Sequence, residues 1–184
     1  LWRRLSAAFN VSFNSDMAVG KSQQISASKE GGNLGTLSYK SENSAVASVD
    51  SNGIITANKA GSAKISCTSQ GGESVSFDIS VKAMPSSISL SASEKSLNEG
   101  QTFDLNARVN SGAYPTSFVY SSADSSVASV SASGRVSAIK EGKTVITAES
   151  ENGVKASCIV YVYSKNDIEL NMRATKVAMD YSNV

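Results

Sequence analysis

A long internal repeat constrains this chain more than any other feature. Residues 39–83 align with residues 120–164 at an offset of 81 without a gap, and 16 of the 45 aligned positions are identical. Upstream of this block the offset becomes 80, so one residue must have been gained or lost between the two stretches. We expect that change in the loops around residues 31–33 and 112–115, where Gly and Pro interrupt the strand pattern. A unit of roughly 75 to 80 residues therefore occurs twice.

The length of the repeat restricts the architecture. About 80 residues is too long for one unit of a solenoid or one propeller blade, whereas it is the size of a small domain that buries about 60% of its unfolded surface. Pro85 marks the break between the two units. We therefore predict an N-terminal extension over 1–9, one domain over 10–84, a second over 85–164, and a C-terminal tail or further element over 165–184.

Alternation of apolar and polar residues dominates each unit. Val75, Phe77, Ile79 and Val81 alternate with Ser and Asp, which indicates a strand with one face in a core and the other in water. The second unit keeps the same phase, with the inward positions Ala156, Cys158, Val160 and Val162. Neither unit contains a segment with the 3.6-residue period of a helix.

Turn signals separate these strands. Asn52-Gly53 is a strong hairpin signal, and Ser133-Gly134 keeps the glycine that tolerates positive φ. Gly61 and Gly142 each precede a strand. About six or seven short strands per unit, spaced by about 8–12 residues, predict a β-sandwich. The expected fold class is all-β.

Composition excludes several classes of function. The absence of His excludes Ser-His-Asp and Cys-His catalysis and His-ligated metals. Seventeen Lys and Arg against 16 Asp and Glu give a net charge of +1, which provides no long-range field for nucleic acid or an anionic membrane. The sequence contains no run of 18 apolar residues, so no membrane-spanning helix is predicted. We expect a binding or structural module rather than an enzyme, with no cofactor, no nucleic acid and no direct membrane insertion.

Several short motifs recur in the same order in both units. The first unit contains Val46-Ala47-Ser48-Val49, then the Asn52-Gly53 hairpin, then Gly61-Ser62-Ala63-Lys64-Ile65. The second contains Val127-Ala128-Ser129-Val130, then Gly134, then Gly142-Lys143-Thr144-Val145-Ile146. This set resembles bacterial immunoglobulin-like domains of group 2, as found in intimin- and invasin-like adhesins and in tailed-phage virion proteins. The resemblance covers about 150 of the 184 residues, with Tyr39 and Tyr120 where the family often has Trp.

The resemblance implies two tandem immunoglobulin-like β-sandwiches. It also implies a structural or adhesive module displayed on a phage virion, as a capsid or tail decoration, or on the bacterial cell surface. Such a module would mediate assembly or weak surface attachment. Its expected partners are other virion or surface proteins, bound through the terminal segments, and a host-surface glycan or protein. The alternative is a carbohydrate-binding appendage of an extracellular bacterial enzyme.

Two groups of residues are candidates for partner contact. A basic and aromatic group lies at the N-terminus, and exposed aromatic side chains able to stack on a sugar or a protein lie in and after the second unit. These candidates are Trp2, Arg3, Arg4, Tyr114, Tyr161, Tyr163 and Tyr181. For the N-terminal group, the alternative to a partner contact is a packed or frayed terminal segment. No catalytic, cofactor or metal residue is predicted.

The two cysteines and one acidic turn have structural explanations. Cys67 and Cys158, one in each unit, fall on inward positions and are predicted to be buried free thiols. Asp50-Ser51-Asn52-Gly53 resembles the opening of a calcium loop, but Gly61 stands where a bidentate Glu would close it. We interpret this segment as a hairpin turn.

The tail departs from the repeat. Ile168, Leu170 and Met172 alternate with polar residues, so a further strand is predicted there. It could begin a third domain, add a strand to a neighbouring subunit, or dock on a parent protein.

Overall fold

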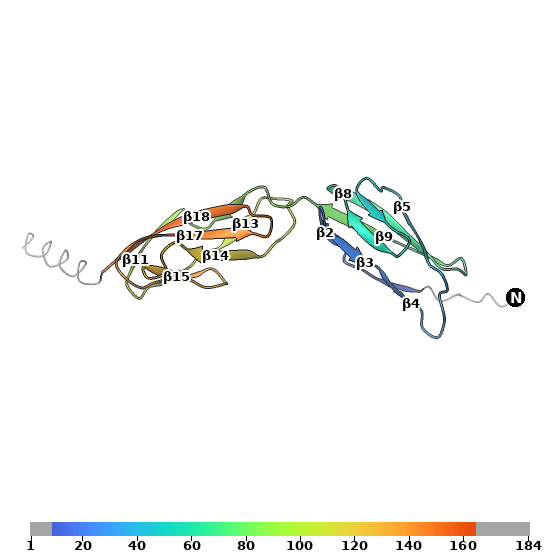
Figure 1. Cartoon of the computed structure of the whole chain (residues 1–184), viewed down its shortest axis with the longest axis horizontal. Helices are drawn as coiled ribbons and strands as arrows, with labels where there is room; N and C mark the ends of the chain where they lie inside the picture. The colour runs from blue at the N-terminus through green and yellow to red at the C-terminus, as the bar shows by residue number, and fades with distance from the viewer. Residues whose placement is uncertain (1–8, 165–184) are drawn as a thin grey trace, which may run out of the picture. The chain divides into compact units, whose positions relative to one another are not determined.

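The computed structural model describes residues 9–164, which form short strands joined by turns and loops (Figure 1). Eighteen strands and no helix occur in this stretch. The chain divides into two units, and the main break falls between Met84 and Pro85. Within the described residues no helix is long and apolar enough to cross a membrane. The expected all-β class is confirmed.

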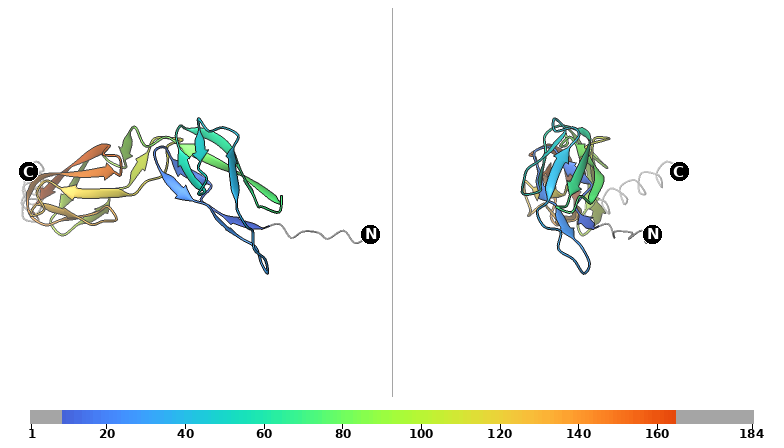
Figure 2. Two further views of the ribbon diagram at one scale, coloured as in Figure 1. Left: turned by 45° about the vertical axis from the view of Figure 1, so that its right-hand side comes forward. Right: turned by 90° about the vertical axis from the view of Figure 1, so that its right-hand side faces the viewer.

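Unit 1 contains nine strands in three sheets. It is the part of the ribbon coloured from blue to green in Figure 2. They are β1 (Asn10–Ser12), β2 (Asp16–Ala18), β3 (Ser22–Gln24), β4 (Ser26–Ser28), β5 (Ser38–Ser41), β6 (Ala47–Val49), β7 (Ile54–Ala57), β8 (Gly61–Thr68) and β9 (Ser74–Lys82). One sheet has the order β2-β9-β8-β5, the second has the order β3-β7-β6, and β1 pairs with β4. β2 runs parallel to β9, and the other neighbours are antiparallel.

Unit 2 repeats this topology strand for strand. Its strands are β10 (Ile88–Leu90), β11 (Glu94–Asn98), β12 (Thr102–Asp104), β13 (Ala107–Val109), β14 (Phe118–Ser122), β15 (Ala128–Val130), β16 (Arg135–Ala138), β17 (Gly142–Ser150) and β18 (Lys155–Tyr163). The sheets have the orders β11-β18-β17-β14, β12-β16-β15 and β10-β13. β11 is parallel to β18, as β2 is to β9 in unit 1.

Each unit has a hydrophobic core of its own. The fully buried side chains include Ile55 and Ile65 in unit 1, and Val136 and Ile146 in unit 2. These residues come from both larger sheets of their unit, so each core lies between two sheets, as in a β-sandwich. The inward faces predicted from alternation are confirmed, because every second residue from Phe77 to Val81 and from Cys158 to Val162 is buried.

The strand count exceeds the expected six or seven per unit because the first two strands of each unit are divided, so that β1 and β2 join different sheets and so do β3 and β4. β1 pairs antiparallel with β4, whereas β2 pairs parallel with β9 in the other sheet. The chain therefore changes sheets over residues 13–15, and the pairing is interrupted there. β10 and β11 divide in the same way.

The structure places the one-residue length change in a range that includes the predicted loops. Ile25 donates its backbone N–H to the hairpin residue Gly53 at 2.9 Å, and Leu105 donates to Gly134 at 2.9 Å, so these residues correspond at an offset of 80. Tyr39 in β5 and Tyr120 in β14 correspond at an offset of 81. The extra residue of unit 2 thus lies between Leu105 and Tyr120, a stretch that includes the predicted loop.

Candidate contact surfaces of the second unit

The structure describes three of the seven residues predicted to contact a partner. Tyr161 and Tyr163 lie two residues apart in β18, and both point to the outer face of the four-stranded sheet. Tyr114 lies in the loop between β13 and β14, half-buried and off that sheet. The remaining candidates, Trp2, Arg3, Arg4 and Tyr181, lie outside the described residues, as does the strand predicted in the tail.

The outer face of unit 2 carries a contiguous group of apolar side chains. Val145 of β17 and Ile159 of β18 lie directly opposite each other in the strand register, and the next outward pair joins Lys143 to Tyr161. Lys143 Nζ lies 5.4 Å from the centroid of the Tyr161 ring, a cation–π geometry. Tyr163, which is 47% exposed, ends the row. We call Val145, Ile159, Tyr161 and Tyr163 the apolar band.

Unit 1 has polar side chains at all four corresponding positions of the same sheet. These residues are Lys64, Asp78, Ser80 and Lys82, and Lys64 lies opposite Asp78 as Val145 lies opposite Ile159. Single exposed apolar residues are normal on protein surfaces, whereas contiguous apolar groups indicate contact sites. Tyr161 and Tyr163 were predicted from the sequence as candidates for contact, whereas Val145 and Ile159 were not. Comparing the outward positions of the aligned repeat would have found them.

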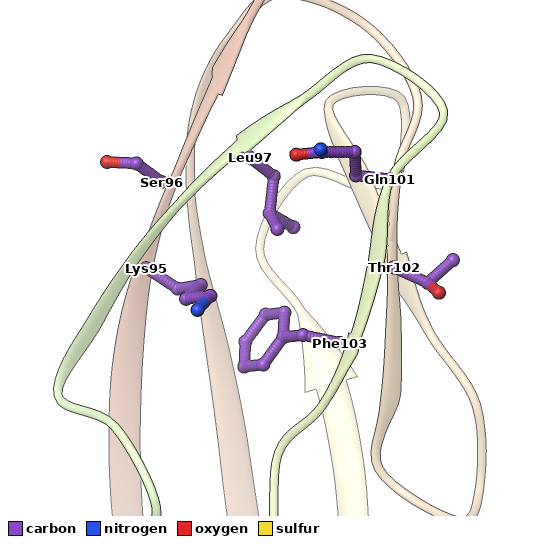
Figure 3. Close-up of a pocket in the computed structure, with 6 residues that line it drawn as sticks. All are labelled: Lys95, Ser96, Leu97, Gln101, Thr102 and Phe103. Carbon is purple, nitrogen blue, oxygen red and sulfur yellow. The ribbon is translucent and has the colours of Figure 1, made fainter.

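A second feature of unit 2 is an open seam between β11 and β12. Each of these strands has one hydrogen-bonded neighbour and lies at the edge of its sheet. A hollow of about 350 Å³ lies between them, and Figure 3 shows Lys95 and Phe103 pointing toward each other across it, with Leu97 between the strands. Lys95 Nζ lies 5.8 Å from the centroid of the Phe103 ring. The other lining residues are Ser96, Gln101 and Thr102.

The corresponding seam of unit 1 is bridged by a side chain. Gln23 stands where unit 2 has Phe103, and its carboxamide bonds twice to the backbone of Asn14. Asn14 N–H donates to Gln23 Oε1 at 2.7 Å, and Gln23 Nε2 donates to the Asn14 carbonyl at 2.7 Å. The two units therefore have the same backbone topology but differ at this edge, because a side chain bridges it in unit 1 and Phe103 cannot do so in unit 2.

The predicted buried thiols are confirmed, since Cys67 and Cys158 are both free and both fully buried. Burial raises the pKa of each thiol, because desolvation disfavours the thiolate. At Cys67 a hydrogen bond from Tyr39 opposes this effect without reversing it. Both side chains act as small apolar members of the packed interior.

Because each thiol is buried in the core of its own unit, its reactivity should report the unfolding of that unit. We expect iodoacetamide to leave both cysteines unmodified in the native chain over hours at pH 8, because neither thiolate is exposed. Denaturant should make each thiol reactive as its unit opens. Tandem mass spectrometry of quenched samples would give two separate labelling curves. Labelling of either thiol at the rate of free cysteine under native conditions would contradict the packing.

The hairpin interpretation of the acidic turn is confirmed. Asp50 Oδ1 accepts backbone N–H groups from Asn52 at 2.9 Å and Ile54 at 2.8 Å, and Gly53 has a φ of 79°. The carboxylate is thus used to hold the turn. No cluster of three or more potential metal-ligating His, Cys, Asp or Glu side chains occurs within residues 9–164.

The sequence profile of bacterial Ig-like domains of group 2 matches residues 9–78 and 86–160, one match in each unit. The chain therefore belongs to this family, and the predicted pair of tandem immunoglobulin-like sandwiches is confirmed. An uncharacterized protein of Clostridium acetobutylicum is 32% identical over 166 residues. Those residues make up 86% of this chain and 17% of that protein, so the chain spans less than a fifth of its relative.

Two solved structures are similar to this chain. The S-layer protein SbsC is 22% identical, with 76% of this chain and 23% of that chain covered and a TM-score of 0.40. A C-terminal fragment of intimin, solved in complex with the intimin-binding domain of the translocated intimin receptor, is 15% identical. The matched region makes up 84% of this chain and 64% of the fragment, with a TM-score of 0.37.

Proposed function

We propose that this chain is a non-catalytic structural and adhesive segment of a bacterial cell-surface protein. Unit 1 serves as a spacer, and unit 2 makes the contact with a partner. The observation that carries this proposal is the difference between two faces on the same backbone. Unit 1 presents Lys64 opposite Asp78 to solvent, and unit 2 presents Val145 opposite Ile159 at the same register position.

The composition of the apolar band supports a protein partner. Tyrosine and aliphatic residues are enriched at the centres of protein interfaces, while charged residues are kept to the rim. Here Tyr161 and Ile159 lie at the centre, and Lys143 and Glu94 flank them on the adjacent strands β17 and β11. Charges of both signs at the rim suit orientation and specificity more than affinity. We therefore expect specific but weak binding by each copy.

The placement on the cell surface is supported by the family to which both units belong. Limited proteolysis of intact cells, followed by mass spectrometry of the released peptides, tests this placement. We expect peptides from both units in the released fraction. Their recovery only from purified phage particles would replace the cell surface with the virion.

Exchanging one residue pair should remove most of the contact. The double variant Val145→Lys with Ile159→Asp reproduces the pair found in unit 1 and leaves the net charge unchanged. We expect binding of the labelled chain to envelope fragments of the producing bacterium to weaken at least about tenfold, because the centre of the interface becomes charged. Co-sedimentation of the labelled chain with the fragments, over a series of chain concentrations, measures this change.

The chain supplies its own control for that exchange. The reverse double variant, Lys64→Val with Asp78→Ile, alters unit 1 to the same extent and leaves the apolar band intact. It should retain the original binding. If protease treatment of the fragments leaves binding unchanged, the carbohydrate-binding alternative gains support and the protein partner is wrong. Equal binding by the wild type and the Val145 and Ile159 double variant would show that the apolar band is not the contact.

A further inference from the structure

The seam of unit 2 exposes backbone hydrogen-bonding groups along one strand edge. β11 pairs with β18 in a parallel ladder, in which Glu99 N–H donates to the Tyr163 carbonyl at 3.0 Å. In such a ladder alternate residues bond to the same neighbour. Glu99, Leu97 and Lys95 therefore direct their backbone groups toward β18. The residues between them, Ser96 and Glu94, direct theirs away from it. They lie on the free edge of the sheet, beside the hollow.

Unit 1 shows what this edge can accept. There the equivalent backbone groups are those of Asn14, and the carboxamide of Gln23 both accepts from and donates to them at 2.7 Å. A carboxamide has the same donor and acceptor as a peptide group. Gln23 therefore occupies the position that one peptide unit of an added strand would take. Unit 2 has Phe103 at this position, and a phenyl ring can make neither hydrogen bond.

The side chains of the seam define what a strand placed there would present. Lys95 and Leu97 lie two residues apart in β11 and point into the hollow, where Leu97 is 5% exposed and Phe103 is half-buried. Within the described residues Lys95 makes no ion pair, and the hollow has no carboxylate in its lining. The hollow therefore offers an apolar surface, formed by Leu97 and Phe103, and the ammonium group of Lys95 without an anionic partner.

We propose that this seam accepts an extended strand of a partner protein, which pairs with the free edge of β11. Side chains two residues apart in an extended strand point to the same face. An apolar residue of the partner would lie over Leu97 and Phe103, and an acidic residue two positions away would lie beside Lys95. Main-chain hydrogen bonds would supply affinity, and these two side chains would supply specificity. This site is separate from the apolar band, which lies on the outer face of the same sheet.

A phage-displayed library of random heptapeptides, selected on the immobilised 184-residue chain, tests the proposal directly. We expect enriched peptides with an apolar and an acidic residue two positions apart. Phe103→Gln places the carboxamide of unit 1 in the seam of unit 2, so it should bridge the edge and weaken the enriched peptides at least about tenfold. Thermal melting and the labelling of Cys158 would show that this variant is folded.

A second variant isolates the acidic residue. Lys95→Ser introduces the residue that unit 1 has at this position, Ser15, and changes an exposed side chain. It should reduce the preference for an acidic residue about fivefold while leaving apolar selection intact, since a surface ion pair contributes on the order of 1 kcal/mol. Persistence of the full acidic preference in this variant would contradict the contact with Lys95.

Three results would overturn the proposal. One is a selection that enriches nothing over the Phe103→Gln variant. Another is a set of peptides that binds both chains equally, since those peptides would lie elsewhere. The third is a concentration-dependent dimer of the free chain that Phe103→Gln abolishes, which would make a second copy the occupant of the seam. Analytical ultracentrifugation of both chains distinguishes the last case.

Discussion

Ile146→Ala is expected to destabilise unit 2 by about 3–4 kcal/mol and to leave unit 1 unchanged. Ile146 lies in β17, is fully buried, and faces Cys158 across the ladder to β18. Removing its three outer carbons costs their transfer free energy and leaves a cavity between the two sheets. For a domain of this size, in which 1 kcal/mol shifts the midpoint by about 4–8 °C, the loss would lower the melting temperature of unit 2 by about 12–30 °C.

The neighbouring residue and the other unit supply the controls. Val145→Ala, one position along the same strand, removes an outward side chain and should cost less than about 1 kcal/mol. Ile65→Ala, at the corresponding position of β8, should destabilise unit 1 as Ile146→Ala destabilises unit 2, because Ile65 is also fully buried. Calorimetry together with labelling of Cys67 and Cys158 assigns each transition to its unit. A loss shared equally by both units would contradict two independent cores.

The features that the sequence predicted correctly are those that depend on local geometry. Alternation over residues 75–81 identified the buried face of β9, since successive side chains of any strand point to opposite faces. Asn52-Gly53 identified a turn because its positive φ suits glycine. The repeat then extended both inferences to unit 2, where Gly134 has a φ of 84°.

The features that it missed depend on contacts between distant strands. β1 and β2 are each three residues long, and neither has a pattern that shows which sheet it joins. Their partners β4 and β9 are determined by packing, which overrides such weak local preference. The bridge from Gln23 to Asn14 likewise joins two ordinary polar residues without a motif. Phe103 alternates with polar neighbours as any half-buried strand residue does, so only the comparison of the two units identifies the seam.

Gly134→Ala is expected to destabilise unit 2 by about 3 kcal/mol, although it adds a single carbon. Gly134 lies in the turn between β15 and β16 with a φ of 84°, where a residue with a Cβ costs about 1–2 kcal/mol. The new Cβ would also lie 2.5 Å from the Leu105 carbonyl oxygen and 2.9 Å from Cζ of Tyr120. Because the first of these is a backbone atom, in a residue whose own N–H is hydrogen-bonded to the Gly134 carbonyl, the backbone itself would have to shift.

Two other glycines with nearly the same φ separate the cost of the backbone from the cost of the contact. Gly153→Ala, at a φ of 82°, meets only Glu149 Oε1 at 3.9 Å and should cost about 1 kcal/mol. Gly53→Ala, at 79°, would approach Tyr39 Cζ to 2.7 Å, but that ring can move, so its cost should be intermediate. Urea unfolding of the three variants, followed at Cys67 and Cys158, measures the order directly. Equal losses would show that the left-handed conformation alone requires glycine, and that close approach of the Leu105 backbone adds nothing.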